Sequence, residues 1–343
     1  MATRAQRITP RTKVILATAA APAACALLSA CGSISSLDTV TDRGRHMTGL
    51  YLVTLGVGAV VLLLVTTVLV LALVRYRASA GGSASEVAEN VRLEIAWTGA
   101  TVLVLGAVFA LSVGAMRAAA GDPPGEPAPM RIEVVGHQWW WEYRYEGDAP
   151  FVAANELHVP IGVPIDLVIT SNDVVHSFWV PALGGKADAV PGRTQTLRVQ
   201  ASSAGHFEGT CAEFCGLQHA WMRILVVAES AEDFARWADG QRAPASSPAA
   251  GAAAAGAQVF ESQTCANCHA IGGSGAAGNV GPDLTHFASR ETLGAGVAPN
   301  DAKHLGDWIR DPDGLKPGVL MPSFPRLTDQ QISDLVAYLQ GLK

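Results

Sequence analysis

A short segment in the middle of the chain concentrates side chains that bind soft metal ions. The segment is Cys211-Ala-Glu-Phe-Cys215-Gly-Leu-Gln-His219-Ala-Trp-Met222, and His176 lies upstream of it. Thiols, imidazoles and a thioether select copper or zinc over magnesium or calcium. Two cysteines four residues apart can both bridge one pair of copper ions, and an electron shared through bridging thiolates moves with little reorganisation. This chemistry suits an electron relay better than a catalyst.

Two other interpretations of these residues are open. A disulfide between Cys211 and Cys215 is compatible with a location outside the cell, although it leaves both histidines and Met222 without a role. A zinc site would use both cysteines and a histidine but has no need of Met222. The residue types therefore favour copper.

A second motif, Cys265-Ala-Asn-Cys268-His269, is the attachment sequence of c-type haem. Its two thiols form thioethers with the haem vinyl groups, and its histidine takes one axial position. Of the six methionines only Met321 lies downstream of the motif, so we expect it to be the second axial ligand. Ligation by His and Met raises the reduction potential, as the acceptance of electrons requires. His286 and His304 are the alternative ligands.

The residues around the cysteine-rich segment predict a small antiparallel β sandwich or barrel over 130–238. Its β-rich runs begin at Met130, Pro164, Thr196 and Met222. Residues 239–257 are mostly Ala, Pro, Ser and Gly, which predicts a flexible linker. Residues 258–343 are predicted to form an all-α domain, and Thr328 is the expected N-cap of its last helix.

Two uncharged stretches, 48–74 and 95–116, are each long enough to cross a membrane as a helix. The short loop between them carries Arg75, Arg77 and Arg92. Positive charge favours the cytoplasmic side, so everything after Met116 is predicted to lie outside. We expect residues 31–118 to form a transmembrane helical hairpin.

The first 30 residues have the pattern of a signal peptide. Basic residues precede an apolar stretch, 14–30, and they are Arg4, Arg7, Arg11 and Lys13. Leu28-Ser-Ala-Cys31 resembles a bacterial lipobox, which predicts a mature lipoprotein that begins at a lipidated Cys31. The alternative is an uncleaved signal anchor with an incidental cysteine.

The chain has a formal net charge of −6, and its acidic excess lies after the membrane stretches. Residues 130–240 contain seven basic and fourteen acidic side chains, and residues 252–343 contain six and nine. An acidic surface suits a basic partner protein and argues against binding of nucleic acid.

The cysteine-rich segment resembles the dinuclear copper domain of cytochrome c oxidase subunit II, in the haem-copper oxidase family. The resemblance implies a cupredoxin-like Greek-key sandwich with a dinuclear copper (CuA) centre. Its implied ligands are the side chains of His176, Cys211, Cys215, His219 and Met222 and the backbone carbonyl of Glu213. The resemblance also implies a magnesium ion on the Glu213 carboxylate, at the boundary with subunit I.

Two further segments are similar to this family. Gly136-His-Gln-Trp139-Trp140-Trp141 resembles its aromatic run, in which the first tryptophan, here Trp139, accepts electrons. Packing of the alternate faces of a strand explains Trp140 and Trp141. Glu94 begins the second membrane helix and matches a family glutamate at the mouth of a proton channel, although an acid there also favours the helix dipole.

The resemblance to subunit II ends near residue 235, and the C-terminal part of the chain is similar to cytochrome c. Gly281-Pro-Asp-Leu and Lys316-Pro-Gly-Val-Leu-Met-Pro resemble loops of the cytochrome c fold. The expected protein is therefore a bacterial oxidase subunit II fused to a cytochrome c domain. An external cytochrome c would reduce haem c, the electron would pass to the copper pair, and subunit I would reduce oxygen to water with coupled proton translocation.

The two membrane stretches contain no histidine, so they cannot hold the haem and copper of an oxygen-reducing centre. That centre must belong to a partner, and the expected partners are oxidase subunits I and III. The expected location is the plasma membrane of a bacterium, with the copper and haem domains on the outer face.

Two other functions are retained. One is the electron-input subunit of a nitric oxide reductase. The other is a membrane-anchored copper store or chaperone, which would use similar soft ligands but has no reason for a covalent haem, for Trp139 or for Glu94.

Overall fold

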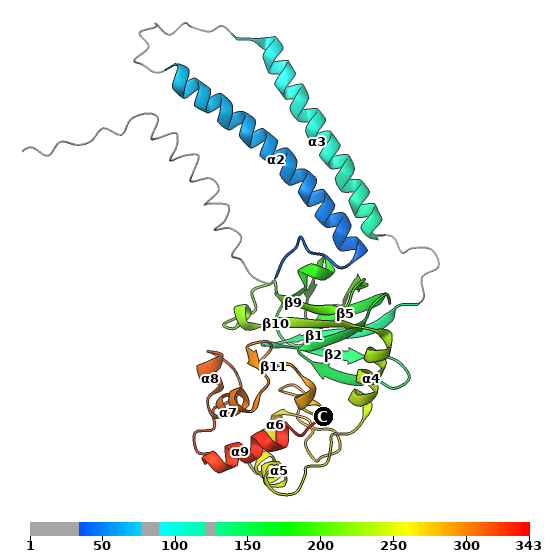
Figure 1. Cartoon of the computed structure of the whole chain (residues 1–343), viewed down its shortest axis with the longest axis vertical. Helices are drawn as coiled ribbons and strands as arrows, with labels where there is room; N and C mark the ends of the chain where they lie inside the picture. Colours follow the sequence, from blue (N-terminus) through cyan, green and yellow to red (C-terminus); the bar gives the residue numbers. More distant parts are fainter. Residues whose placement is uncertain (1–33, 77–88, 121–127) are drawn as a thin grey trace, which may run out of the picture.

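The computed structural model describes residues 34–76, 89–120 and 128–343. These residues form a helical hairpin, a β sandwich and a helical domain, which follow one another along the long axis of the molecule (Figure 1). The predicted signal peptide, 1–30, and the predicted lipid site, Cys31, lie outside the described residues.

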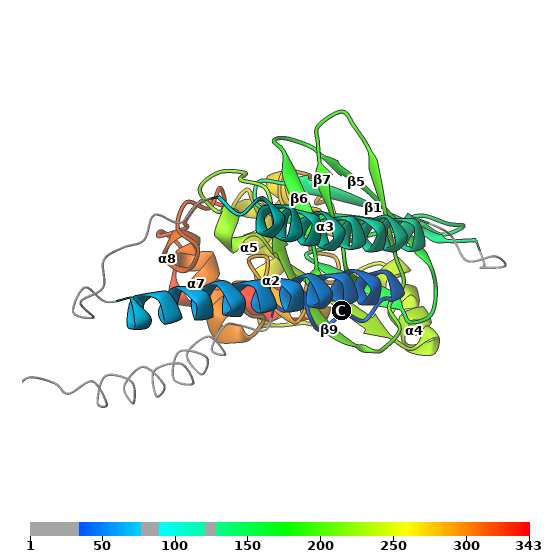
Figure 2. The ribbon, with the colours of Figure 1, turned by 90° about the horizontal axis from the view of Figure 1, so that it is seen from above.

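Two long apolar helices form the hairpin and lie side by side (Figures 1 and 2). They are α2, Asp42–Arg75, and α3, Val91–Ala120, and each is long and apolar enough to cross a membrane. Both predicted spans lie inside these helices. The Thr41 side chain caps α2 by accepting the N–H of Gly44, so the helix begins before its apolar stretch.

The start of α2 is attached to the sandwich. The Thr41 hydroxyl donates to the Leu183 carbonyl at 3.0 Å, and the Val40 N–H donates to the Ala182 carbonyl at 2.8 Å. The Ser202 N–H donates in turn to the Val40 carbonyl at 2.8 Å. These bonds hold the hairpin against the end of the β domain.

The β domain consists of two five-stranded sheets, ordered β3-β2-β1-β5-β8 and β4-β10-β9-β6-β7. The strands of the first sheet are β1 (Met130–His137), β2 (Trp140–Tyr145), β3 (Phe151–Ala154), β5 (Ile165–Ser171) and β8 (Gln195–Val199). Those of the second are β4 (Glu156–Pro160), β6 (His176–Trp179), β7 (Lys186–Ala189), β9 (Gly205–Cys211) and β10 (Arg223–Glu229). The predicted sandwich is confirmed.

The expectation of purely antiparallel pairing is wrong at two places. Strands β1 and β5 pair in parallel, and so do β4 and β10. The chain leaves the first sheet after β3, forms β4 in the second sheet and returns as β5. Such a crossover brings β5 back in the direction of β1, and run composition alone does not reveal it.

The inner faces of the sheets form the core of the sandwich. Along β2 the side chains of Trp141, Tyr143 and Tyr145 are buried, while Arg144 faces solvent. This is the alternation expected of a strand with one core face. Trp140 points to the opposite face yet is also buried, because it packs against Ala154 and against Ala295 of the helical domain.

The helical domain has its own core. Its helices are α5 (Ala252–Ser262), α6 (Cys265–Cys268), α7 (Ala302–Arg310), α8 (Pro312–Leu315) and α9 (Asp329–Leu339). Helices α5 and α9 pack together, with the rings of Phe260 and Tyr338 5.9 Å apart. The side chains of Thr328 and Gln331 form a capping box, which confirms the predicted N-cap. A short ladder of β11 (Thr292–Leu293) and β12 (Ala298–Pro299) is an addition to the all-α expectation.

The helices do not follow the boundaries of the predicted linker, 239–257. Helix α4, Ala231–Arg242, packs on β3 and β4 and continues beyond residue 239, and α5 begins at Ala252. Only residues 243–251 lie between the helices. In this stretch the Ala245 N–H donates to the Gly272 carbonyl, and His286 Nε2 bonds to the Ala243 carbonyl at 3.0 Å. Alanine has the highest helix propensity, so the Ala-rich residues from 252 onward start α5 rather than extend a loop.

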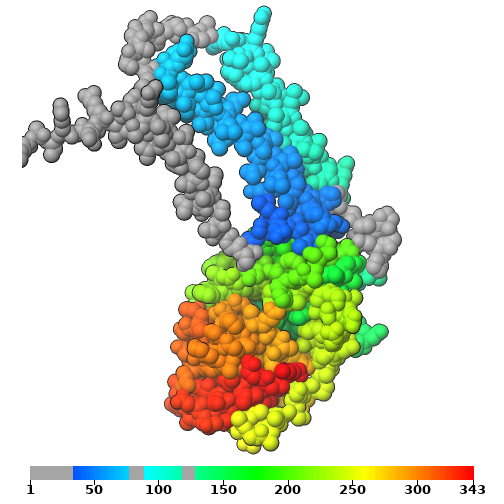
Figure 3. Space-filling view, in the orientation of Figure 1, coloured from blue at the N-terminus to red at the C-terminus, as the bar shows by residue number. Residues whose placement is uncertain are grey.

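The helical domain packs against the sandwich over a broad face (Figure 3). Glu156, at the start of β4, is 3% exposed, and its carboxylate accepts the N–H groups of Glu291 at 2.9 Å and Thr292 at 2.8 Å. The Thr292 hydroxyl donates to the same carboxylate at 3.0 Å. Because the buried carboxylate has its partners in the other domain, this contact defines one relative orientation of the two.

Candidate functional site

Three elements of the second sheet bring the predicted copper ligands together. His176 begins β6, Cys211 ends β9, and the following loop, which includes the 3₁₀ helix η3 (His219–Trp221), supplies the others before β10. The two thiol sulfurs, Cys211 Sγ and Cys215 Sγ, are 3.8 Å apart. Cys211 Sγ lies 4.0 Å from His176 Nδ1. Cys215 Sγ lies 3.8 Å from His219 Nδ1 and 3.9 Å from Met222 Sδ.

Glu213 contributes differently from the side-chain ligands. Its backbone carbonyl accepts from the Cys211 thiol at 3.2 Å, so it faces the cluster, while its side chain is exposed. Within the described part of the chain, the one group of three or more His, Cys, Asp or Glu side chains that converges is His176, Cys211 and Cys215. A magnesium ion on the Glu213 carboxylate would therefore take its other ligands from elsewhere.

The charges of the two thiols are coupled. The hydrogen bond between the two thiols lowers the pKa of Cys211 to about 3, and the same interaction together with burial raises the pKa of Cys215 well above its ordinary value. One thiolate thus forms easily and the second does not, since two negative charges would lie 3.8 Å apart in a buried place. A pair of cations between them removes that conflict, so the donor set fits copper.

Asp173 orients the first histidine of the cluster. Its Oδ1 lies 2.8 Å from His176 Nε2, which leaves Nδ1 facing Cys211. Burial disfavours the charged imidazole, but the bonds to Asp173 and Cys211 outweigh it and raise the pKa of His176. A carboxylate behind a metal-binding histidine is the usual arrangement that fixes the ring.

No disulfide joins Cys211 and Cys215, whose sulfur atoms lie 3.8 Å apart. The disulfide interpretation of this pair is therefore wrong. The other two described cysteines, Cys265 and Cys268, are also free.

Trp139 connects the cluster to the helical domain. It lies between β1 and β2, is 8% exposed, and its indole N–H donates to the Cys215 carbonyl at 3.0 Å. Gln138 donates to the same carbonyl at 2.7 Å. Gly216, at φ +119°, lies against the indole, where a Cβ would be 2.9 Å from the ring. This close approach requires glycine.

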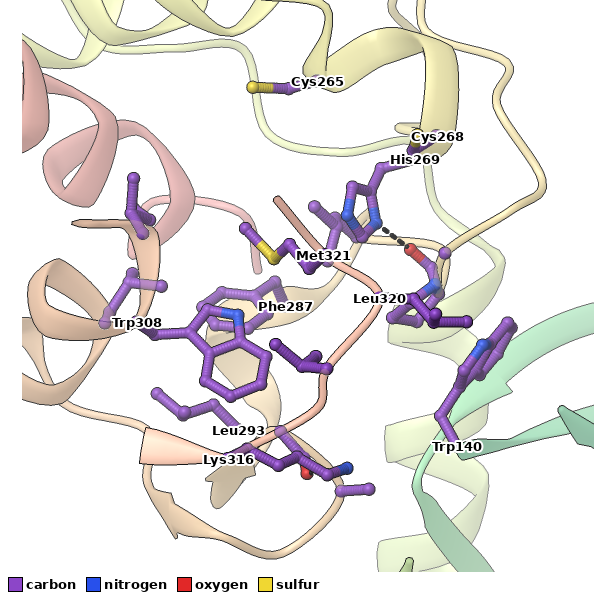
Figure 4. A pocket seen from close by; sticks show the side chains of 18 of the residues that line it. Trp140, Cys265, Cys268, His269, Phe287, Leu293, Trp308, Lys316, Leu320 and Met321 are labelled. Carbon is purple, nitrogen blue, oxygen red and sulfur yellow. Dashed lines mark hydrogen bonds between the residues drawn. The ribbon is translucent and has the colours of Figure 1, made fainter. Parts of the chain in front are cut away.

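A cavity of about 240 Å³ lies in the helical domain next to Trp139 and Trp140. Figure 4 shows the side chains of Cys265, His269 and Met321 around it, together with Trp308 and Phe287. The predicted attachment motif and the single downstream methionine thus line one cavity. Its wall is otherwise mostly apolar, as a haem requires.

The histidine of the motif is held in one tautomer. His269 Nδ1 donates to the Pro282 carbonyl at 2.8 Å (Figure 4), which leaves Nε2 without a proton. Burial lowers the pKa of His269, so the neutral imidazole is favoured. Gly281 lies against the ring, where a Cβ would be 2.5 Å from Cε1. The residues therefore fit an axial ligand of haem c.

The alternative axial ligands have other partners. His286 is buried, and its Nε2 bonds to the Ala243 carbonyl at 3.0 Å. His304 Nδ1 bonds to the Asp301 carboxylate at 2.7 Å, at the start of α7. Of the described histidines, only His269 lines the cavity. Glu94 lies in the first turn of α3, at the end of the hairpin farther from the sandwich (Figure 1).

Three buried residues at the boundary of the two domains were not expected from the sequence. Lys316 Nζ donates to the carbonyls of Trp139 at 3.1 Å and Gly294 at 2.8 Å, and Gln218 Nε2 donates to the Lys316 carbonyl at 2.9 Å. Glu156 is the third. Charged and polar side chains are usually exposed. Only for Lys316 did the sequence contain a signal of burial, namely its position five residues before Met321.

Comparison with known proteins identifies both domains. The family "Cytochrome C oxidase subunit II, periplasmic domain" matches residues 150–229, and the family "Cytochrome c" matches residues 253–343. The crystal structure of the periplasmic domain of cytochrome oxidase subunit II (CoxB) of Bradyrhizobium japonicum is 32% identical, with a TM-score of 0.33, over 34% of this chain and 96% of that one.

Two relatives that match most of the chain carry the same name. Cytochrome c oxidase subunit 2 of Alkalihalophilus pseudofirmus is 36% identical over 92% of this chain and 94% of its own length. That of Bacillus subtilis is 31% identical over 79% of this chain and 81% of its own. Since both the copper-type domain and the cytochrome domain are covered, the chain belongs to the cytochrome c oxidase subunit 2 family and carries a C-terminal cytochrome c domain.

Proposed function

We propose that this subunit relays single electrons from an external cytochrome c, through a haem c and a dinuclear copper centre of its own, to subunit I. Subunit I would reduce oxygen to water and couple this to proton translocation. Family membership supports the partners, which are subunit I and a cytochrome c donor. When bound, the haem and the copper pair supply the one-electron carriers of the relay.

The copper pair would be held by the cluster described above. The proposed side-chain ligands are His176, Cys211, Cys215, His219 and Met222, and the Glu213 carbonyl completes the set. The two thiolates balance the charge of the metals. Asp173 holds the His176 ring in place. The same burial that couples the thiols excludes water and keeps reorganisation small.

The haem would be held in the cavity of the cytochrome domain. Cys265 and Cys268 would form the thioethers, and His269 and Met321 would be the axial ligands. The Pro282 carbonyl holds His269 in the required tautomer. The thioether of Met321 would favour the reduced form of the haem and so keep its potential high enough for it to accept an electron from the donor.

One observation supports this route most directly. Trp139 lines the haem cavity and, through its indole N–H, bonds the carbonyl of a copper-cluster cysteine, Cys215. A single side chain thus contacts both sites. Trp139 is buried in the sandwich core, and on its other side it contacts the cytochrome domain. We therefore propose that the external donor meets the cytochrome domain, and that Trp139 conducts between the two sites of the chain.

The hairpin supplies the other half of the proposed role. We propose that residues 31–118 anchor the chain in the plasma membrane with residues 130–238 and 258–343 outside, and that subunit III and a magnesium ion at Glu213 complete the complex. Glu94 would serve proton uptake, which Glu94→Gln tests. In this variant, reduction of the oxygen-reducing centre should slow while reduction of copper stays unchanged. Equal rates in the variant and the parent would show that Glu94 serves only as a charge at the helix end.

The relay is tested by stopped-flow spectroscopy of the whole oxidase mixed with a reduced cytochrome c. Trp139→Ala should leave haem reduction fast and slow the reduction of copper. Trp140→Phe is the control, because Trp140 also lines the cavity but does not bond the copper loop. Copper that is reduced before haem in the parent, or at parental speed in Trp139→Ala, would contradict the route.

A further inference from the structure

A buried lysine lies in the wall of the haem cavity, and no carboxylate of the described residues is its partner. Lys316 follows α8 in the chain and precedes Met321. It is 2% exposed and lines the cavity (Figure 4). Its ammonium donates to two neutral groups, the carbonyls of Trp139 and Gly294. Among the residues that the structure describes, no carboxylate forms an ion pair with it.

Such a cation is unfavourable unless an opposite charge compensates for the loss of water. Burial accordingly lowers the pKa of Lys316 to about 7. An ammonium has three N–H donors, of which the two carbonyls use two. The third is available for an anion.

The cofactor proposed for this cavity brings such an anion. A haem carries two propionate groups, and the wall of the cavity is mostly apolar, with Phe260, Leu284 and Trp308 among its residues. Arg290 is the other cation among the described residues of the wall, and the nearby carboxylates of Glu156 and Asp283 already stabilise its charge. Lys316 is therefore the better placed of the two to take a new carboxylate.

We propose that Lys316 binds a haem propionate and thereby joins the haem to the backbone of Trp139. This inference rests on the proposed haem site. One ammonium would contact the cofactor, the Trp139 carbonyl on the copper side and the Gly294 carbonyl on the cytochrome side.

The copper loop holds this lysine in place from a second direction. The Gln218 amide, 1% exposed, donates to the carbonyls of Lys316 at 2.9 Å and Pro317 at 3.1 Å. Gln218 lies between the copper-cluster residues Cys215 and His219 in the sequence. The sandwich thus holds the backbone of Lys316 through Gln218 and its ammonium through the Trp139 carbonyl.

The test compares Lys316→Met, which keeps the length and removes the charge, with Lys316→Arg, which keeps the charge. The haem midpoint potential of the purified oxidase is measured by spectroelectrochemical titration across neutral pH. Loss of a cation beside the haem favours the oxidised form, so Lys316→Met should raise the ratio of oxidised to reduced haem at a fixed potential about three- to tenfold. Lys316→Arg should stay close to the parent.

A second readout separates propionate binding from a purely structural role. Without Lys316 the propionate pKa rises, so the potential of Lys316→Met should depend on pH in the neutral range, and a protonated carboxyl band should appear in redox difference infrared spectra. An unchanged potential and pH profile in Lys316→Met, with intact haem and copper spectra, would overturn this inference alone. Absence of haem c from the parent protein would instead overturn the proposed function.

Discussion

The copper cluster and the haem cavity place their ligands in opposite ways. In the cluster each sulfur lies within 4.0 Å of another ligand atom, and Cys211, Cys215 and Met222 belong to the same buried core as Trp139 and Phe178. In the cytochrome domain the ligands surround a cavity, and core residues such as Phe287 and Leu335 line it. The proposed copper ligands are part of a packed core, whereas the proposed haem ligands lie around a cavity that core residues of the cytochrome domain line.

The largest effect expected from this difference is on folding of the cytochrome domain. Replacing Cys265 and Cys268 by Ala prevents covalent attachment, so the apolar wall loses its central packing partner and the domain should lose cooperative unfolding. The sandwich should keep its own transition. Hydrogen exchange measured separately for 130–229 and 253–343 checks this, and a protected cytochrome domain in the haem-free variant would break the comparison.

Changes in the copper cluster should affect chemistry more than folding. Cys215→Ser preserves shape but removes one of the two proposed bridging thiolates, so copper content, the near-infrared copper band and most oxidase activity should be lost. The haem spectrum should remain, and the sandwich should lose only about 1–3 kcal/mol. A variant that kept the full copper signal would show that Cys215 is not a ligand.

A single axial ligand should have a smaller effect. Met321→Leu keeps the apolar volume and removes the thioether sulfur, so the haem potential should fall while the thioether bonds keep the haem attached. Reduction by the external donor should slow. Redox titration and the copper spectrum are measured together, because a simultaneous change at copper would mean that the two sites are not independent.

The boundary between the domains should show the smallest effect. Glu156→Gln keeps an acceptor for Glu291 and Thr292 but loses the charge, which should weaken docking by about 1–2 kcal/mol and raise hydrogen exchange at these two amides. Glu146→Gln is the control, since Glu146 pairs with Arg131 at the exposed surface, where ion pairs contribute little. Equal hydrogen exchange at these two amides in Glu156→Gln and Glu146→Gln would show that the buried carboxylate has no role in docking.

Local patterns in the sequence predicted the helices, strands and caps that depend on interactions between residues near one another in the chain. The helical spans, the strands that begin near Met130 and Met222, and the Thr328 cap depend on residues close together in the chain. The structure also brings all the predicted copper ligands into one cluster. The assignment of these residues as ligands remains a prediction that the variants above test.

Features that depend on distant partners could not be predicted. The burial of Glu156 requires amides more than 130 positions away, and Lys316 requires the carbonyl of Trp139. Trp140 was expected to pack within a strand, but its outward face is covered by Ala295. A charged residue in a strand or loop is usually solvated, so its sequence context gave no reason to expect burial.

The Glu156 contact limits how freely the two halves can be recombined. By family the chain divides into two modules, 150–229 and 253–343, each of which has relatives of its own. Yet Glu156 belongs to the first module while its N–H donors belong to the second. A chimera that exchanged the cytochrome module alone would have to supply matching backbone donors, or it would bury an unpaired carboxylate. The two modules must therefore be inherited, or engineered, as a matched pair.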